Sequence, residues 1–124
     1  MSKLEDRVSW LNHNNKRILY ADYSGLKGDD LMTVFKKSKQ TQINAGKDIL
    51  LIVNFTNAKA NNEIVTALKQ AGRELDADMK KTAVIGLAAL HKIFYNGYIR
   101  VTGQGHKTKT FNSVEESIDW ITSD

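Results

Sequence analysis

Short apolar runs alternate along this chain with longer stretches in which apolar residues recur at helical spacing. The clearest run is Ile49 to Val53, five apolar residues in a row, which continues through Asn54 and Phe55 into a polar segment. A run this short with no polar face is typical of a strand in the middle of a sheet, covered on both sides. We therefore place this strand at the centre of the predicted fold.

Four other segments have the alternation or the apolar content of strands. Residues 8–12 and 17–23 flank a turn at 13–16, where two asparagines tolerate left-handed backbone, and together they predict an antiparallel hairpin. Residues 82–85 predict a second buried strand. Residues 107–111 predict a short polar edge strand, whose lysines would discourage pairing with another sheet.

Stripes of apolar residues predict the helices. The first begins at Asp29 or Asp30, either of which could cap it, and ends near Gly46. The second is capped by Asn61 or Asn62. The third has the clearest period, with positions 90, 93, 94, 97, 98 and 101 on one face. The last begins with a capping box that starts at Ser113.

This order of elements predicts an α/β fold. An N-terminal β-hairpin is followed by repeated strand–helix units, which gives a mixed, mostly parallel five-stranded sheet with about four helices. The chain has 124 residues, enough for one domain over 1–124 with a single core.

Composition narrows the class of protein. There is no cysteine, which excludes disulfides, thiolate metal sites and a cysteine nucleophile. The first residues carry charges and no apolar signal core, and no apolar run approaches the roughly 20 residues of a membrane span. We expect a cytoplasmic protein with no membrane span.

The net charge of +4 raises the question of nucleic acid. The 14 acidic residues are spread among 18 basic ones, and the basic clusters at 36–39 and 80–81 are short. A solvated charged face is therefore favoured over a phosphate-binding patch, and we expect no nucleic-acid partner.

Candidate catalytic chemistry is weak. His13, His91 and His106 have no metal-ligand spacing, and no clustered carboxylates accompany them. Ser24-Gly25 lacks the flanking residues of a hydrolase elbow, and the glycines near 86 and 103 do not form a phosphate-binding or dinucleotide motif. We expect no metal, no cofactor and no enzyme.

The polar loop after the central strand is the candidate functional site, because ligands and partners dock at the carboxyl ends of strands in open α/β sheets. A plain capped connection is an equally good interpretation of the same loop. The residues predicted to form a partner-binding or regulatory surface are Thr56, Asn57, Lys59 and Asn61.

The alternative site is a pocket for a small apolar ligand or lipid, held between the sheet and the third helix. The residues predicted to line it are Phe94, Gly97 and Tyr98. In this second hypothesis the protein is a carrier or sensor of that ligand.

Several phrases of the sequence, in this order, resemble the STAS-like family of small domains related to the anti-sigma-factor antagonists of sporulation control. The resemblance covers essentially the whole chain. The phrases are Tyr23-Ser24-Gly25-Leu26, Leu50-Leu51-Ile52-Val53-Asn54-Phe55-Thr56, Lys80-Lys81-Thr82-Ala83-Val84-Ile85-Gly86-Leu87 and Phe111-Asn112-Ser113-Val114-Glu115-Glu116, followed by Trp120 in the last helix.

The resemblance implies strand–helix turns that wind as a superhelix, with helices mostly on one side of the sheet. It also implies regulation through a protein partner. In the sporulation proteins a serine after the central strand is phosphorylated, within a segment like Asp-Ser-Ser-Gly. The matching loop here is Thr56-Asn57-Ala58-Lys59, so Thr56 is the only hydroxyl that could take the phosphate.

One question stays open at this level. Helices on one side would leave the other face of the sheet bare, yet Ile49 to Val53 is apolar on both faces. A crossing helix or a homodimer is favoured as the cover, ahead of another partner or an apolar ligand.

Overall fold

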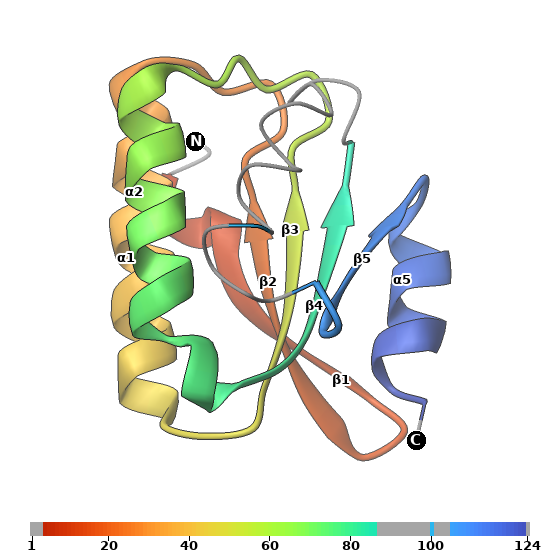
Figure 1. Ribbon diagram of the computed structural model, residues 1–124. Coiled ribbons are helices and arrows are strands. Elements are labelled where there is room, and N and C mark those ends of the chain that lie inside the picture. The colour runs from red at the N-terminus through yellow and green to blue at the C-terminus, as the bar shows by residue number, and fades with distance from the viewer. Residues whose placement is uncertain (1–3, 87–99, 101–104, 124) are drawn as a thin grey trace.

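The computed structural model describes residues 4–86, 100 and 105–123. Five strands form one sheet in the order β1-β2-β3-β4-β5 (Figure 1). The first pair is antiparallel and every later pair is parallel. Their bounds are β1 Val8–His13, β2 Lys16–Asp22, β3 Ile49–Asn54, β4 Met79–Ile85 and β5 Thr108–Phe111. The predicted hairpin and mixed, mostly parallel sheet are confirmed.

Three α-helices lie within the described residues, together with two short 3₁₀ turns. The helices are α1 Asp29–Ala45, α2 Asn62–Glu74 and α5 Val114–Ile121, and the turns are Leu4–Arg7 and Asp76–Asp78. The helix predicted over 90–101 falls almost entirely outside the described residues.

The β1–β2 turn adopts the geometry that its sequence predicts. Asn14 and Asn15 both have left-handed backbone, with φ of 51° and 65°. This is the conformation of a two-residue turn whose twist matches that of the flanking strands. The turn fixes the register, so that His13 pairs with Lys16.

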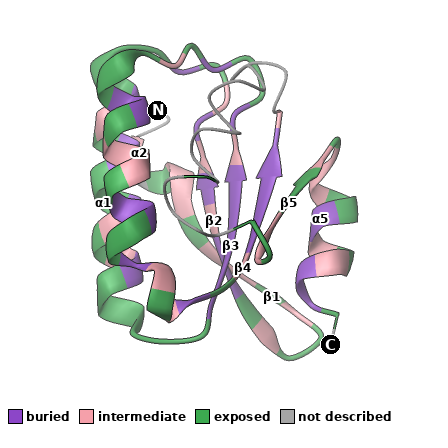
Figure 2. Ribbon diagram, in the orientation of Figure 1, coloured by how far each residue is buried: buried purple, intermediate pink, exposed green. Residues whose placement is uncertain are grey.

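The side chains of β3 point alternately into two separate apolar clusters. Leu51 and Val53 pack on the side of α1 and α2. Leu50 and Ile52 pack on the other side, with Ile121 of α5. Figure 1 shows α5 across the sheet from α1 and α2, and Figure 2 shows β2, β3 and β4 buried between these layers. A crossing helix, one of the two favoured alternatives, thus covers this face.

Two lysines hold α5 in place through its carboxyl end. Lys16 Nζ donates to the carbonyl of Thr122 at 2.8 Å, and Lys81 Nζ donates to that of Trp120 at 3.0 Å. The last carbonyls of a helix lack partners inside it and carry the negative end of its dipole, so cations there are stabilising. Lys81 Nζ also lies 5.0 Å from the centroid of the Trp120 ring. This helix of eight residues is thereby anchored to β2 and β4.

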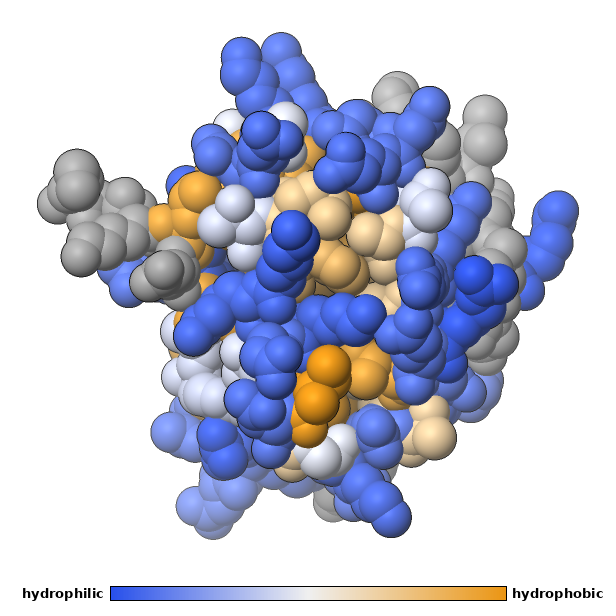
Figure 3. Space-filling view, turned by 90° about the vertical axis from the view of Figure 1, so that its left-hand side faces the viewer, coloured by the Kyte–Doolittle hydropathy of each residue, from blue (hydrophilic) through white to orange (hydrophobic). Residues whose placement is uncertain are grey.

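The outward face of α1 and α2 is largely hydrophilic (Figure 3). Lys36 and Lys37 are exposed there, and Lys39 Nζ lies 2.9 Å from Glu74 Oε2 and links the two helices. Hydrogen bonds from Lys39 and Gln70 hold the pKa of the Glu74 carboxyl below its ordinary value. No helix in the described ranges is long and apolar enough to cross a bilayer.

The start of α1 differs from the sequence prediction. Its N-cap is Gly28, with φ 59° and no side-chain cap, so neither Asp29 nor Asp30 caps the helix. Both aspartates lie in the first turn instead, where the positive end of the helix dipole stabilises negatively charged side chains. The left-handed backbone at position 28 suits glycine, and this moves the boundary one residue earlier.

Of the two asparagines predicted as the N-cap of α2, the structure has Asn61. Asn61 Oδ1 accepts the Ile64 backbone N–H at 2.8 Å. We expect Asn61→Ala to lower the free energy of unfolding by about 1 kcal/mol, because one helix N–H loses its acceptor. Asn62→Ala, at the first helical position, should change it by less. Urea denaturation of the two variants compares them, and equal losses would contradict the assignment.

Candidate functional site

The loops after β2 and β3 are joined by backbone hydrogen bonds at the edge where the parallel strands end. Gly25 N donates to Thr56 O at 2.9 Å, and Lys59 N donates to Leu26 O at 2.9 Å. Lys27 and Lys59 form an isolated parallel bridge. Because each loop supplies the partners of the other, their backbones form a single fixed surface.

A third loop meets this surface at Gly86, directly after β4. A Cβ placed on Gly86 would lie 2.5 Å from Thr56 N and 2.7 Å from Thr56 Cα. Gly86 also has φ of +81°, a left-handed conformation that other residues adopt at a cost. The glycine is therefore needed twice, for its backbone angle and for the close approach of the Thr56 backbone.

Asn54, the last residue of β3, is the centre of a side-chain hydrogen-bond network at this edge. Its Oδ1 accepts the backbone N–H of Thr56 at 3.0 Å and the Thr56 hydroxyl at 2.7 Å. Its Nδ2 donates to the phenol oxygen of Tyr20 at 2.9 Å. Both ends of the amide are thus used, which fixes the Thr56 side chain against the end of the sheet.

The pKa of the Tyr20 phenol is raised by its surroundings. Burial raises its pKa above the ordinary value, and the nearby Asp22 carboxylate adds to this, while the hydrogen bond from Asn54 and the charge of Arg7 act in the opposite direction. Arg7 itself donates to the carbonyl of Ser24 at 2.8 Å. The segment before β1 is thereby tied to the loop after β2.

The predicted site residues divide into two groups. Thr56, Asn57 and Lys59 have exposed side chains on the joined loops, and Asn57 has left-handed backbone with φ of 58°. Asn61 is also exposed, but its side chain caps α2 and has a structural role. The first three are therefore brought together as a surface, and the fourth supports it.

Three residues at this edge were not predicted as part of the site. Tyr20 and Asn54 form the hydrogen-bond network behind Thr56. Lys27 lies beside Lys59 through the backbone bridge between the two loops. A polar residue at the end of an otherwise apolar strand is the sequence signal that points to Asn54. No local signal pairs Lys27 with Lys59, because they belong to different strand–helix connections.

The alternative ligand pocket lies outside the described residues, since Phe94, Gly97 and Tyr98 all fall there. Of the histidines, His13 ends β1 and His106 lies in a turn. Among the residues that the structure describes, no three histidine or acidic side chains gather in a way that could hold a metal ion.

The Thr56 hydroxyl has limited chemistry of its own. Its proton is donated to an amide oxygen of Asn54, which is too weak a base to activate a nucleophile. Because the residue is exposed, the hydroxyl is accessible to a group transferred by another protein.

Comparisons with protein-family models, with curated proteins and with solved structures gave no match for this chain.

Substitution of Gly86 tests the close approach of the loops. Gly86→Ala should lower the free energy of unfolding by about 2–4 kcal/mol, because left-handed strain and an overpacked contact add together. Gly25→Ala is the matched control, since Gly25 has φ of +70° but open space around its Cβ; it should cost about 1 kcal/mol. Equal losses in urea denaturation would exclude the steric contribution.

Titration of Tyr20 tests its environment. The unfolded chain loses this phenol proton first as the pH rises through about 10. The stability that Tyr20 contributes is therefore constant below that pH and is lost above it. The near-ultraviolet absorbance of phenolate, compared between the native chain and Tyr20→Phe, should place Tyr20 above pH 10. A difference curve centred at or below 10 would contradict the shift.

Proposed function

We propose that this chain is a non-enzymatic regulatory domain of the STAS-like type, which acts by binding another protein across the joined loops. The observation that carries the proposal is that exposed polar side chains stand on a backbone fixed by hydrogen bonds between two loops. Such a surface loses little conformational entropy when a partner binds. Its position at the carboxyl ends of the parallel strands supports the same interpretation.

Charge indicates the kind of partner surface. Lys27 and Lys59 are exposed side by side, and in the described part of the chain no carboxylate pairs with either. Acidic groups on a partner would complement this pair and speed the encounter.

A phosphate on Thr56 would change this surface in two ways. The hydroxyl would lose the proton that it donates to Asn54 Oδ1, and negative charge would be added next to that oxygen. Both effects would detach the side chain from the end of β3. A modification of Thr56 would therefore alter the surface that the partner contacts.

Capture of binding proteins from an extract of the source cells, with matched variants, tests the proposal. We expect the native chain to retain a partner protein. Lys59→Glu and Thr56→Glu should each weaken the affinity for that partner about tenfold or more, as for a central interface residue. Lys36→Glu is the control, because Lys36 is also exposed but lies on α1. If both loop variants retained every partner of the native chain, the docking surface would be assigned wrongly.

A further inference from the structure

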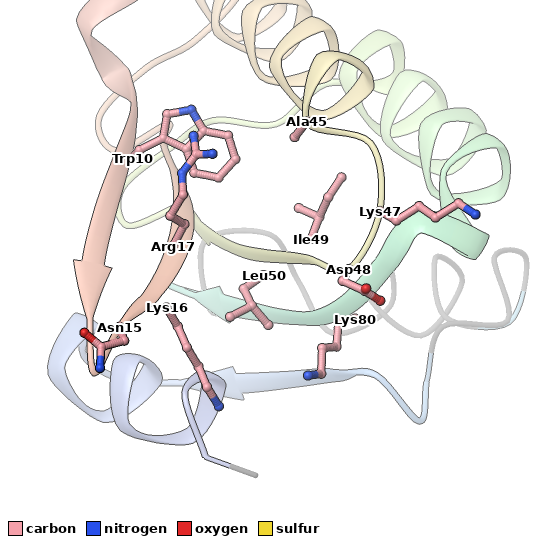
Figure 4. A pocket seen from close by; sticks show the side chains of 10 residues that line it. All are labelled: Trp10, Asn15, Lys16, Arg17, Ala45, Lys47, Asp48, Ile49, Leu50 and Lys80. Atoms are coloured by element: carbon pink, nitrogen blue, oxygen red, sulfur yellow. The ribbon is translucent and has the colours of Figure 1, made fainter.

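A second candidate site lies at the opposite edge of the sheet, where β3 and β4 begin and the β1–β2 hairpin turns. A hollow of about 440 Å³ opens there (Figure 4). Small-molecule sites commonly have volumes of about 300–1,000 Å³. The size of the hollow therefore suits a small molecule better than a protein partner.

The side chains around this hollow are mostly cationic. Lys16, Arg17, Lys47 and Lys80 line it, with Asp48 as the one carboxylate among the lining residues. The whole chain has a net charge of +4, so this rim holds a large part of its positive excess. Potential concentrated in a concave site attracts anions.

Three of these cations are available to a ligand. Arg17, Lys47 and Lys80 are exposed, and among the described residues no carboxylate pairs with them. Lys16 differs, because it donates to the Thr122 carbonyl. The three available cations come from β2, from the connection between α1 and β3, and from β4. They lie on separate elements around the hollow, and the Lys47 side chain extends outward from it (Figure 4).

Arg17 is held in place by an aromatic ring. Its guanidinium carbon lies 3.9 Å from the centroid of the Trp10 ring. A stacked guanidinium keeps the N–H groups along its edge available for an oxyanion, with part of its rotamer freedom already lost. The rim therefore contains one oriented donor and two flexible ones.

The two aliphatic residues at the base of the hollow are almost fully covered. Ile49 and Leu50 line it but are only 3% and 7% exposed. The charged groups that the hollow offers are mainly cations, and several separated cations are best used by an anion with more than one charged group. We propose that this hollow binds a small soluble anion bearing two or more phosphate groups, held by Arg17, Lys47 and Lys80.

Calorimetry on the full chain, without divalent cations, tests the proposal with inorganic tripolyphosphate and inorganic phosphate as probes. Tripolyphosphate should bind at least about tenfold more tightly than phosphate. Arg17→Gln and Lys80→Gln should each raise its Kd about tenfold, the loss expected for one charge-assisted hydrogen bond. Both residues are exposed, and thermal unfolding of each variant checks that the fold is kept.

The control is Lys36→Gln, which removes the same charge from the outer face of α1 and should leave the Kd of tripolyphosphate within about twofold. Absence of tripolyphosphate binding would overturn the proposal. So would an equal loss in the control, because the attraction would then be general charge. A single-stranded RNA oligonucleotide that bound this rim more than about tenfold more tightly than tripolyphosphate would assign the site to nucleic acid instead.

Discussion

The structure depends on one constraint, the central strand β3, which is apolar on both faces. A strand with this composition must be covered on both sides, since either bare face would leave apolar surface in water. Leu51 and Val53 are covered by α1 and α2, and Leu50 and Ile52 by α5. The second cover is a helix of only eight residues, which is why its anchoring by Lys16 and Lys81 matters to the whole fold.

The same strand also builds the candidate site. All parallel strands end at one edge, and β3 ends there with a polar residue, Asn54. Its amide joins Tyr20 of the neighbouring strand to Thr56 of the following loop. A buried strand that ended in another apolar residue would leave the loop without this attachment. The change from apolar to polar at position 54 therefore fixes both where the core ends and how the candidate surface is oriented.

Most of the fold could be predicted because its signals are local. The asparagine pair of the hairpin turn, the unbroken apolar run of β3 and the caps Asn61 and Ser113 each act within a few residues. The N-cap of α1 was assigned wrongly because an aspartate side chain is a better acceptor than glycine, whereas the backbone angle at Gly28 decided the boundary.

The features that could not be predicted depend on contacts between distant segments. The sequence marks Thr56, Asn57 and Lys59 as polar, but it does not show that Lys27 lies beside Lys59. The basic hollow is a similar case, since Arg17, Lys47 and Lys80 lie about 30 residues apart along the chain. In the sequence each of them is an ordinary surface cation. Only the order of the strands in the sheet brings them to the rim of one hollow.

The two candidate surfaces lie at opposite ends of β3, and the rigidity and length of this strand make them independent. The strand is buried on both faces and paired on both edges, so it cannot shift without breaking core contacts and ladder hydrogen bonds. Its six residues span roughly 17 Å. The Debye length at physiological salt is about 8 Å, so exposed charges at one end are largely screened from the other. An anion in the hollow would therefore leave the binding of a partner at the Thr56 loop unchanged, and each surface has to be explained by its own ligand.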